Sequence, residues 1–246
     1  MKNLSRTPCP KHRAASGFTL TEMLVVIFII ATLAVVAFFA VRSVRQKAWA
    51  ANASSNLRQC ATAIHSYVGD EGRYPECWDF GGGSGGGSWS WQIRDYLGYD
   101  TLGGWPASVL LHPRHGTVRF DGLTDSQRKN LHHFAASAIL FRDVDETKTN
   151  NNKTYVRPGE IGDPSSVIMI GDAPLKQPGE PAEGSDGTWW PLRNAAVKGD
   201  GNEPVDEAAL LKSVEFWLNN KAQFLFIDGH VETLAPAEVK KKHFQL

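Results

Sequence analysis

The longest hydrophobic run of the chain lies near its N-terminus, where residues 23–41 are interrupted only by Thr32. These nineteen residues, in a helix, would extend about 28 Å, which is close to the hydrocarbon thickness of a bilayer. No charged residue falls within the run. The pattern therefore predicts a membrane-spanning helix, which we assign to residues 18–41.

A periodic pattern follows over residues 42–70. Its apolar positions recur every three or four residues, which is typical of a helix that buries one stripe. Neither Gly nor Pro occurs between Gly17 and Gly69, so one continuous helix is predicted across both patterns. Gly69 is expected to end it in a left-handed conformation, and Pro75 prevents its resumption. The predicted stripe comprises Leu57, Cys60, Ala61, Ile64, Tyr67 and Val68.

Residues 71–246 carry shorter patterns that predict one globular domain. Helical spacing is found at 89–97 and 206–212, and the glycine-rich residues 81–88 predict a surface loop that buries little. The predicted fold is α+β, with the long N-terminal helix packed on an antiparallel sheet. Strands are predicted at 117–120, 134–141 and 167–170, with a hairpin over 223–234 that turns at Asp228-Gly229.

Charge on either side of the hydrophobic run bears on its orientation. Residues 1–17 contain four basic residues and no acidic one, which favours a cytoplasmic N-terminus. Arg42, Arg45 and Lys47 on the far side argue weakly for the opposite orientation. A secretory signal cleaved after Ala48-Trp49-Ala50 is an alternative. The run is longer than the apolar region of such signals, which counts against that cut.

The sequence Ser-Gly-Phe-Thr-Leu-Thr-Glu-Met-Leu at residues 16–24 resembles the cleavage site of type IV prepilins and type II secretion pseudopilins. The resemblance implies that a prepilin peptidase cuts between Gly17 and Phe18 and methylates the new amine of Phe18. Residues 1–17 would then be a leader peptide. Glu22 occupies the place of the acidic residue of that motif.

Glu22 is also unusual on physical grounds. A charged side chain within a membrane-spanning helix costs up to about 3 kcal/mol, so a plain anchor has no need of one. In the resembling family, the partner of this carboxylate is the free amine of a neighbouring subunit. Opposite charges attract more strongly where water is scarce, which favours such a pair. The alternative is a simple single-pass anchor.

Two further passages resemble a large pilin-like family with N-terminal methylation sites and a C-terminal H-X9-DG element. The first runs from Asn56 to Pro75, and the second is Asp-Gly-His-Val at residues 228–231. The His of that element would lie ten residues before Asp228, where this chain has Leu218. We therefore expect Asp228 and Gly229 to have a structural role in a hairpin rather than to form a site.

The cysteines and the net charge limit the remaining chemistry. Cys60 and Cys77 would both lie on the exported side, where an oxidising compartment permits a disulfide between them. Alternatively, Cys60 simply packs on the buried stripe. Lys plus Arg and Asp plus Glu are equal at 26 each, so no overall positive field favours nucleic acid as a partner.

Several motifs suggest ligands without a complete binding pattern. His112 and His115, like the pair His132-His133, lack the remaining ligands of a zinc site. Residues 200–206 gather oxygen ligands for calcium, but they do not match an EF-hand. Trp189-Trp190 is either a platform for sugar rings or a packed pair on a strand. We predict no metal and no cofactor, and calcium and polysaccharide stay open as alternatives.

The resemblance to prepilins and pseudopilins implies a structural subunit of a type II secretion or type IV pilus-related fibre, and the hydrophobic patterns agree with it. Its expected partners are a prepilin peptidase, other pilin-like subunits and the bacterial inner membrane, which it crosses once with the C-terminal domain on the periplasmic side. No Ser-His-Asp or paired-carboxylate spacing indicates an enzyme. The alternative is a membrane-anchored exported module that binds polysaccharide or another surface ligand and shares only the processing route.

Overall fold

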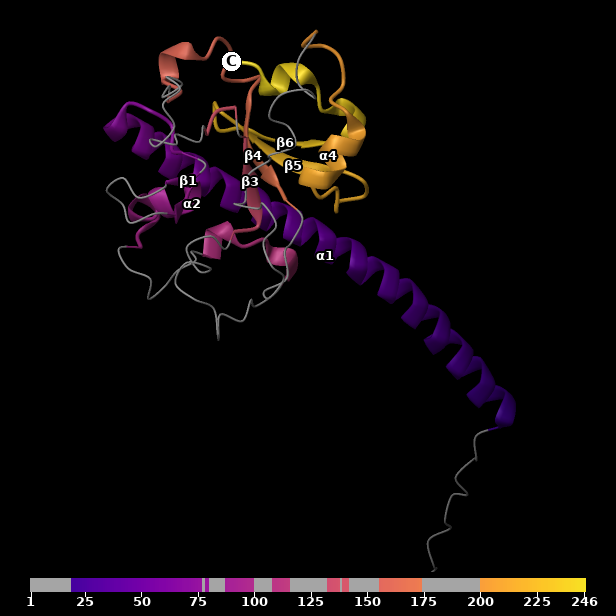
Figure 1. Ribbon diagram of the computed structural model, residues 1–246. Coiled ribbons are helices and arrows are strands. Elements are labelled where there is room, and N and C mark those ends of the chain that lie inside the picture. Colours follow the sequence, from indigo (N-terminus) through magenta and orange to yellow (C-terminus); the bar gives the residue numbers. More distant parts are fainter. Residues whose placement is uncertain are drawn as a thin grey trace, which may run out of the picture. The chain divides into compact units, whose positions relative to one another are not determined.

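The computed structural model describes residues 19–76, 78–79, 87–99, 108–115, 132–137, 139–141, 155–173 and 200–246. The fold is α+β, as predicted, and consists of a long N-terminal helix and a four-stranded antiparallel sheet (Figure 1). The chain divides into two compact units, Met1–Arg45 and Gln46–Leu246. Helix α1 (Leu20–Glu71) contributes residues to both.

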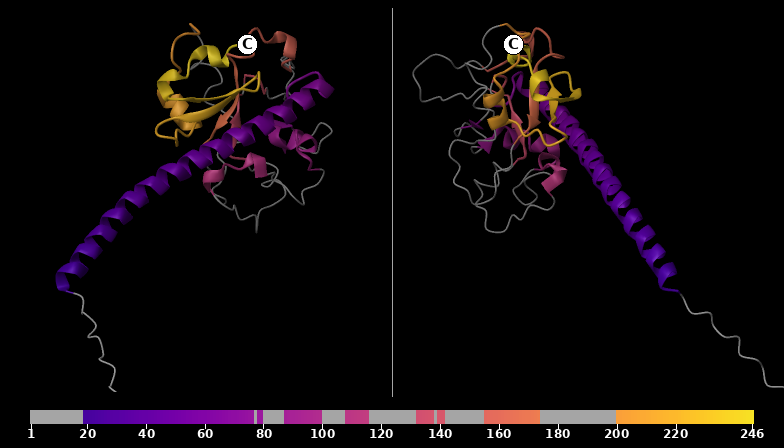
Figure 2. Two further views of the ribbon diagram at one scale, coloured as in Figure 1. Left: turned by 180° about the vertical axis from the view of Figure 1, so that it is seen from behind. Right: turned by 90° about the vertical axis from the view of Figure 1, so that its right-hand side faces the viewer.

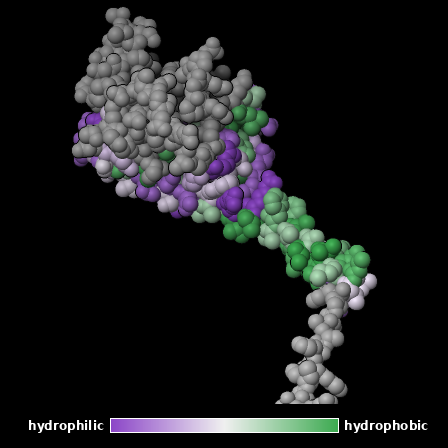
Figure 3. All heavy atoms as spheres, turned by 90° about the horizontal axis from the view of Figure 1, so that it is seen from below, coloured by the Kyte–Doolittle hydropathy of each residue, from purple (hydrophilic) through white to green (hydrophobic). Residues whose placement is uncertain are grey.

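The first unit contains the apolar part of α1. Its large hydrophobic side chains, from Leu20 to Val44, are exposed, and Figure 3 shows a largely hydrophobic surface along this part of the helix. By length and composition α1 can cross a membrane. An uncovered apolar surface of this kind is unfavourable in water and favourable in hydrocarbon.

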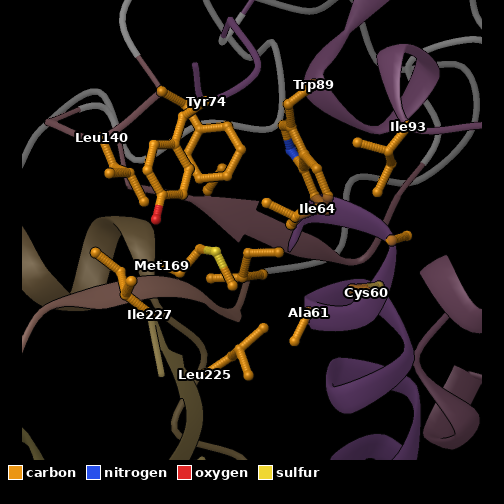
Figure 4. Close-up of a cluster of buried hydrophobic side chains, with 14 of the residues drawn as sticks. Cys60, Ala61, Ile64, Tyr74, Trp89, Ile93, Leu140, Met169, Leu225 and Ile227 are labelled. Carbon is orange, nitrogen blue, oxygen red and sulfur yellow. The ribbon is translucent and has the colours of Figure 1, made fainter. Parts of the chain in front are cut away.

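The predicted buried stripe of α1 is confirmed in the second unit. All six expected residues, from Leu57 to Val68, are buried, together with Ala53 and Ala63. They contact the aromatic and aliphatic core shown in Figure 4, which includes Tyr74, Trp89 and Met169. Burial of a large apolar side chain contributes about 1.5–3 kcal/mol, so this half of the helix is held by packing.

The predicted end of α1 at Gly69 is wrong by about one turn. The helix continues to Glu71, and Gly72 adopts the left-handed conformation with φ +67°. Two contacts explain the later end. The Tyr96 hydroxyl donates to Asp70 Oδ2 at 2.9 Å, and Tyr74 enters the core with its amide bonded to the Val156 carbonyl at 3.0 Å.

The sheet has the order β3-β4-β5-β6. One face packs with the second half of α1, which runs across it in Figures 1 and 2, and the other with helix α4 (Glu207–Ser213) and the C-terminal residues. The predicted hairpin is confirmed, with Gly229 at φ +91° in its turn. The strands are β3 (Phe134–Ala136), β4 (Ile168–Asp172), β5 (Ala222–Phe226) and β6 (Val231–Leu234).

Helix α4 is confirmed close to its predicted position. Asp206 caps it, since its Oδ1 accepts from the Ala209 amide at 2.9 Å. Strand β3 is shorter than predicted, because the chain turns back after it: the amides of Leu140 and Phe141 both donate to the Ser137 carbonyl. The predicted strand at 117–120 lies outside the described residues.

The segment predicted as a helix over 89–97 is divided into two short pieces. Helix α2 (Trp89–Gln92) and the 3-10 helix η1 (Asp95–Leu97) are separated by a turn. Strand β2 (Gly87–Ser88) comes immediately before α2 and pairs with β1 (Trp78–Asp79). The end of the glycine-rich segment is therefore part of the fold, because Ser88 is fully buried, contrary to the prediction of a loop that buries little.

Candidate functional site

The N-terminal site begins at the first described residue. Thr19 precedes helix α1, and Glu22 is the third residue of that helix. The Thr19 amide and hydroxyl both donate to Glu22 Oε2 at 2.8 Å, and the Glu22 amide donates to the Thr19 hydroxyl at 3.3 Å. This reciprocal pattern is a capping box, which satisfies amides that have no partner inside the helix.

The capping box gives the Glu22 carboxylate a partner within its own chain. The positive end of the helix dipole lies at the same place and also favours a negative charge. From the sequence, the only partner expected for this carboxylate was the amine of a neighbouring subunit. The spacing Thr19-x-x-Glu22 was the available signal for the local alternative. Gly17 and Phe18, the predicted cleavage residues, lie outside the described residues.

Cys60, one half of the predicted disulfide, is fully buried on α1. Burial raises the pKa of its thiol to about 12. A thiol in this environment is unreactive at neutral pH, because the thiolate is the nucleophile. Cys77 lies outside the described residues, so the disulfide stays a prediction.

Asp228 and Gly229 form the turn between β5 and β6. Asp228 Oδ1 accepts from the amide of His230 at 3.0 Å and lies 2.6 Å from His230 Nδ1. Partial burial opposes ionisation, but these bonds hold the pKa of Asp228 below its usual value. The His230 ring stacks on Phe226, with 4.2 Å between ring centroids. The turn is thus stabilised by its own side chains.

The same turn is connected to helix α1. His65 Nε2 lies 2.7 Å from the carbonyl oxygen of Ile227. A carbonyl oxygen only accepts, so Nε2 carries the proton of this hydrogen bond. Leu218, which stands in the place of the expected His, exchanges backbone hydrogen bonds with Lys221 in another turn. The contacts of Asp228 and Gly229 are those of a structural turn.

Sequence reasoning missed a buried polar cluster around Asp172, the last residue of β4. Asp172 is 1% exposed. Its Oδ2 accepts from the backbone amide of Gln223 at 2.8 Å and from Trp217 Nε1 at 2.7 Å. His112 Nε2 lies 3.7 Å from Oδ1. We call Asp172, His112, Trp217 and Gln223 the Asp172 cluster.

The imidazole of His112 is oriented by neighbouring backbone. The Arg114 amide donates to His112 Nδ1 at 3.1 Å, which leaves the ring proton of the neutral form on Nε2, facing Asp172. The backbone amide of His112 donates to His133 Nδ1 at 2.9 Å. The Trp217 ring lies edge-on to the His112 ring, with 4.6 Å between the ring centroids. These contacts fix which atom of His112 faces the carboxyl group.

The Asp172 cluster also reaches helix α1. Gln223 Nε2 donates to Ser54 Oγ at 2.7 Å and to the Ala50 carbonyl at 3.1 Å. Burial raises the pKa of Asp172 to about 7, although the bonds from Gln223 and Trp217 oppose this shift. The cluster joins residues far apart in the sequence, so no local spacing of residues could predict it.

The candidate metal sites gain no support from the described residues. No group of three or more His, Cys, Asp and Glu side chains converges among them. In the segment considered for calcium, Glu203 is ion-paired with Lys241 at 2.6 Å, and the Gly201 carbonyl accepts from the Lys242 amide at 2.8 Å. The C-terminal residues thus occupy these oxygens. Trp189-Trp190 lies outside the described residues.

Comparison with known proteins gives one match. Residues 12–38 match the family described as the prokaryotic N-terminal methylation motif. The match covers the predicted cleavage site, Glu22 and most of the apolar run. Searches of curated proteins and of solved structures found no significant match. The motif indicates a type IV pilin-like protein that a prepilin peptidase processes.

Proposed function

We propose that the chain is a structural subunit of a type II secretion or type IV pilus-related fibre. Cleavage between Gly17 and Phe18 and methylation of Phe18 would produce the mature form. The observation that carries the proposal is the methylation motif at residues 12–38, of which the part from Leu20 onward lies on a helix whose apolar side chains are exposed. In this form the chain has an apolar helix and a folded domain, the two parts that a fibre subunit needs.

The exposed apolar side chains of the helix support assembly, because they must be shielded from water. In the inner membrane, lipid covers the side chains from Leu20 to Val44. In a fibre, the helices of neighbouring subunits would cover the same surface, and helix packing would replace lipid contacts. The proposal places the second unit on the periplasmic side of the membrane and makes the peptidase and other pilin-like subunits its partners.

Glu22 would exchange partners on assembly. In the isolated chain its carboxylate bonds to Thr19 within the capping box. In the fibre it would pair with the amine of a neighbouring Phe18, where the low dielectric strengthens the attraction. Loss of the carboxylate would leave that amine buried without a counter-charge, which is strongly unfavourable.

A structural role is favoured over a catalytic one. The described residues include one Ser-His contact, in which the Ser90 hydroxyl lies 3.3 Å from His132 Nδ1. Ser90 is fully buried, however, and its hydroxyl also lies 2.8 Å from that of Ser88. A nucleophile needs access to its substrate, so this pair is better explained as core packing.

The experiment compares Glu22→Gln and Glu22→Ala with the wild type in cells that carry the cognate assembly system. Gln at the third position preserves a capping box and removes the charge, whereas Ala removes both. Mass spectrometry of the N-terminus measures cleavage and methylation, and crosslinking with sheared-fibre yield measures assembly. We expect all three proteins to be cleaved and both variants to fail in assembly.

Each other outcome has a definite meaning. Wild-type multimer yield from both variants would reject the assembly role of Glu22 and favour the anchored binding module. Failure of Glu22→Ala alone would assign Glu22 to capping rather than to charge pairing. An uncleaved wild type, or one cleaved elsewhere, would reject the processing step itself.

A further inference from the structure

The Asp172 cluster lies where three parts of the second unit meet. Asp172 ends strand β4, Gln223 belongs to β5, and Trp217 lies in the segment between α4 and β5. Gln223 extends the contacts to Ala50 and Ser54 of α1. The backbone amide of Gln223 thus contacts Asp172, while the side chain of the same residue contacts helix α1.

The hydrogen bonds of Asp172 are unevenly divided between its two oxygens. Oδ2 accepts two N–H donors, at 2.7 and 2.8 Å. Oδ1 is buried and has no hydrogen-bond partner among the described residues. Its distance of 3.7 Å from His112 Nε2 exceeds that of a good hydrogen bond. A buried ionised carboxylate needs more donors than this, whereas a neutral carboxyl group needs fewer.

The charged groups near Asp172 compensate one another. Arg114 favours the ionised form of Asp172 and Glu215 opposes it, and these two residues form an ion pair with each other. Among the described residues, the groups of strand β5 and helix α1 that bond within this cluster are neutral and belong to Gln223, Ala50 and Ser54. On the β3 side, His133 Nδ1 accepts from the backbone amide of His112.

We propose that Asp172, facing His112, is a buried proton-binding site whose deprotonation destabilises the folded domain. The proton comes from solvent and is held by the carboxyl group of Asp172, whose Oδ2 accepts both N–H donors. Loss of this proton leaves a buried negative charge with one oxygen short of donors. The proposal concerns the folded domain and holds whether or not the chain assembles into a fibre.

The stability of the folded domain depends on pH because the folded and unfolded states bind different numbers of protons at Asp172. The pKa of Asp172 is raised from 3.8 to about 7 by burial, so the folded state keeps a proton that the unfolded state releases. Asp172 therefore favours folding fully below about pH 4, and this contribution is lost as the pH rises to about 7. Between pH 5 and pH 8 the folding equilibrium constant should fall by about 10- to 100-fold through this group alone.

The test compares urea unfolding of the full chain in a mild detergent at several values between pH 5 and pH 8. Asp172→Asn mimics the neutral carboxyl group and should abolish this part of the pH dependence. The ratio of wild-type to variant folding constants should fall by about 10- to 100-fold across the range. Asp163→Asn is the matched control, because Asp163 is exposed and its hydrogen bonds with Ser165 and Ser166 lower its pKa. The control should run parallel to the wild type.

A second measurement keeps the proposal testable if Asp172→Asn does not fold. The carboxyl carbon shift of Asp172 in the ¹³C-labelled wild type should titrate with a midpoint above pH 6. Trp217→Phe removes a donor to Oδ2 and should move that midpoint upward. Amide exchange at Gln223 and at residues 50–54 should accelerate with pH more than intrinsic exchange does.

Three results would overturn the proposal. One is a wild type and Asp172→Asn with parallel pH profiles, and another is a carboxyl midpoint below pH 5. The third is amide exchange at Gln223 and residues 50–54 that follows the intrinsic rate alone. A purely structural Asp172 would change stability by the same factor at every pH and would produce the first of these results.

Discussion

The amide of Gly72 donates to the carbonyl of Val68 at 2.9 Å, while Gly72 itself adopts φ +67°. This pair closes the last turn of helix α1 and sends the chain toward the buried Tyr74. Gly69, three residues earlier, remains helical, and a Cβ added there would meet nothing within 4 Å. Gly72 therefore needs the positive φ that glycine allows, whereas Gly69 has a helical conformation that any residue with a side chain can adopt.

We expect Gly69→Ala to stabilise the domain by about 0.5–1 kcal/mol, because alanine loses less backbone entropy in a helix. Gly72→Ala should destabilise it by about 1 kcal/mol or more, because a Cβ is unfavourable in the left-handed region. Urea unfolding of the two variants beside the wild type measures both effects. Equal shifts of the same sign would show that the helix does not end at Gly72.

The glycine-rich segment offers a test of where the fold begins. Deleting residues 82–85 leaves strands β1 and β2 intact and only shortens their connection, and loop-closure entropy changes slowly with length. We expect the thermal midpoint to fall by less than about 8 °C, which corresponds to about 2–4 kcal/mol for a domain of this size.

Deleting residues 81–88 is the matched comparison, because it removes β2 and the buried Ser88. This variant should be distinctly less stable than the shorter deletion, as measured by calorimetry of the folded domain. Indistinguishable midpoints for the two deletions would contradict the pairing of Trp78 with Ser88.

Because of the buried His243, we expect the folded domain to lose stability in acid. Burial, with help from Lys242 and Lys240, lowers the pKa of His243 to about 4. The unfolded chain binds a proton near pH 6.5 that the folded chain refuses, so stability falls as the pH drops from about 6.5 toward 4. This direction is opposite to that of Asp172, so each group must be measured by its own variant.

His243→Gln should remove this dependence, because a Gln side chain can still accept from the Lys240 amide, which now donates to His243 Nδ1 at 3.2 Å. Relative to its own stability at pH 7.5, the wild type should lose about 1–2 kcal/mol more than the variant at pH 4.5. Urea titrations at the two pH values measure the difference. Equal losses in both proteins would mean that His243 accepts a proton in the folded state.

Processing at the N-terminus depends on Gly17 in our proposal. Gly17→Ala should leave a longer, unprocessed protein in the membrane, because a peptidase that binds this residue needs the close backbone approach that glycine allows. Gly69→Ala is the control and should be cleaved normally. Immunoblotting and N-terminal mass spectrometry compare the two, and a normally shortened Gly17→Ala product would reject this cleavage site.

Local patterns in the sequence were sufficient for the elements whose stability depends on nearby residues. The apolar run and the stripe from Leu57 to Val68 identify α1, because helical periodicity alone decides which side chains share a face. Asp228-Gly229 identifies the hairpin in the same way, because a tight turn needs a residue that accepts positive φ. The methylation motif is likewise contained in consecutive residues.

The tertiary structure alone decided features that join distant residues. Where α1 ends depends on the burial of Tyr74 and on the bond from Tyr96 to Asp70, neither of which is part of the helical pattern. The Asp172 cluster exists because sheet pairing brings Asp172 beside Gln223 and a turn places Trp217 against His112. Its raised pKa comes from burial, and burial is a property of the packed domain that no local spacing of residues encodes.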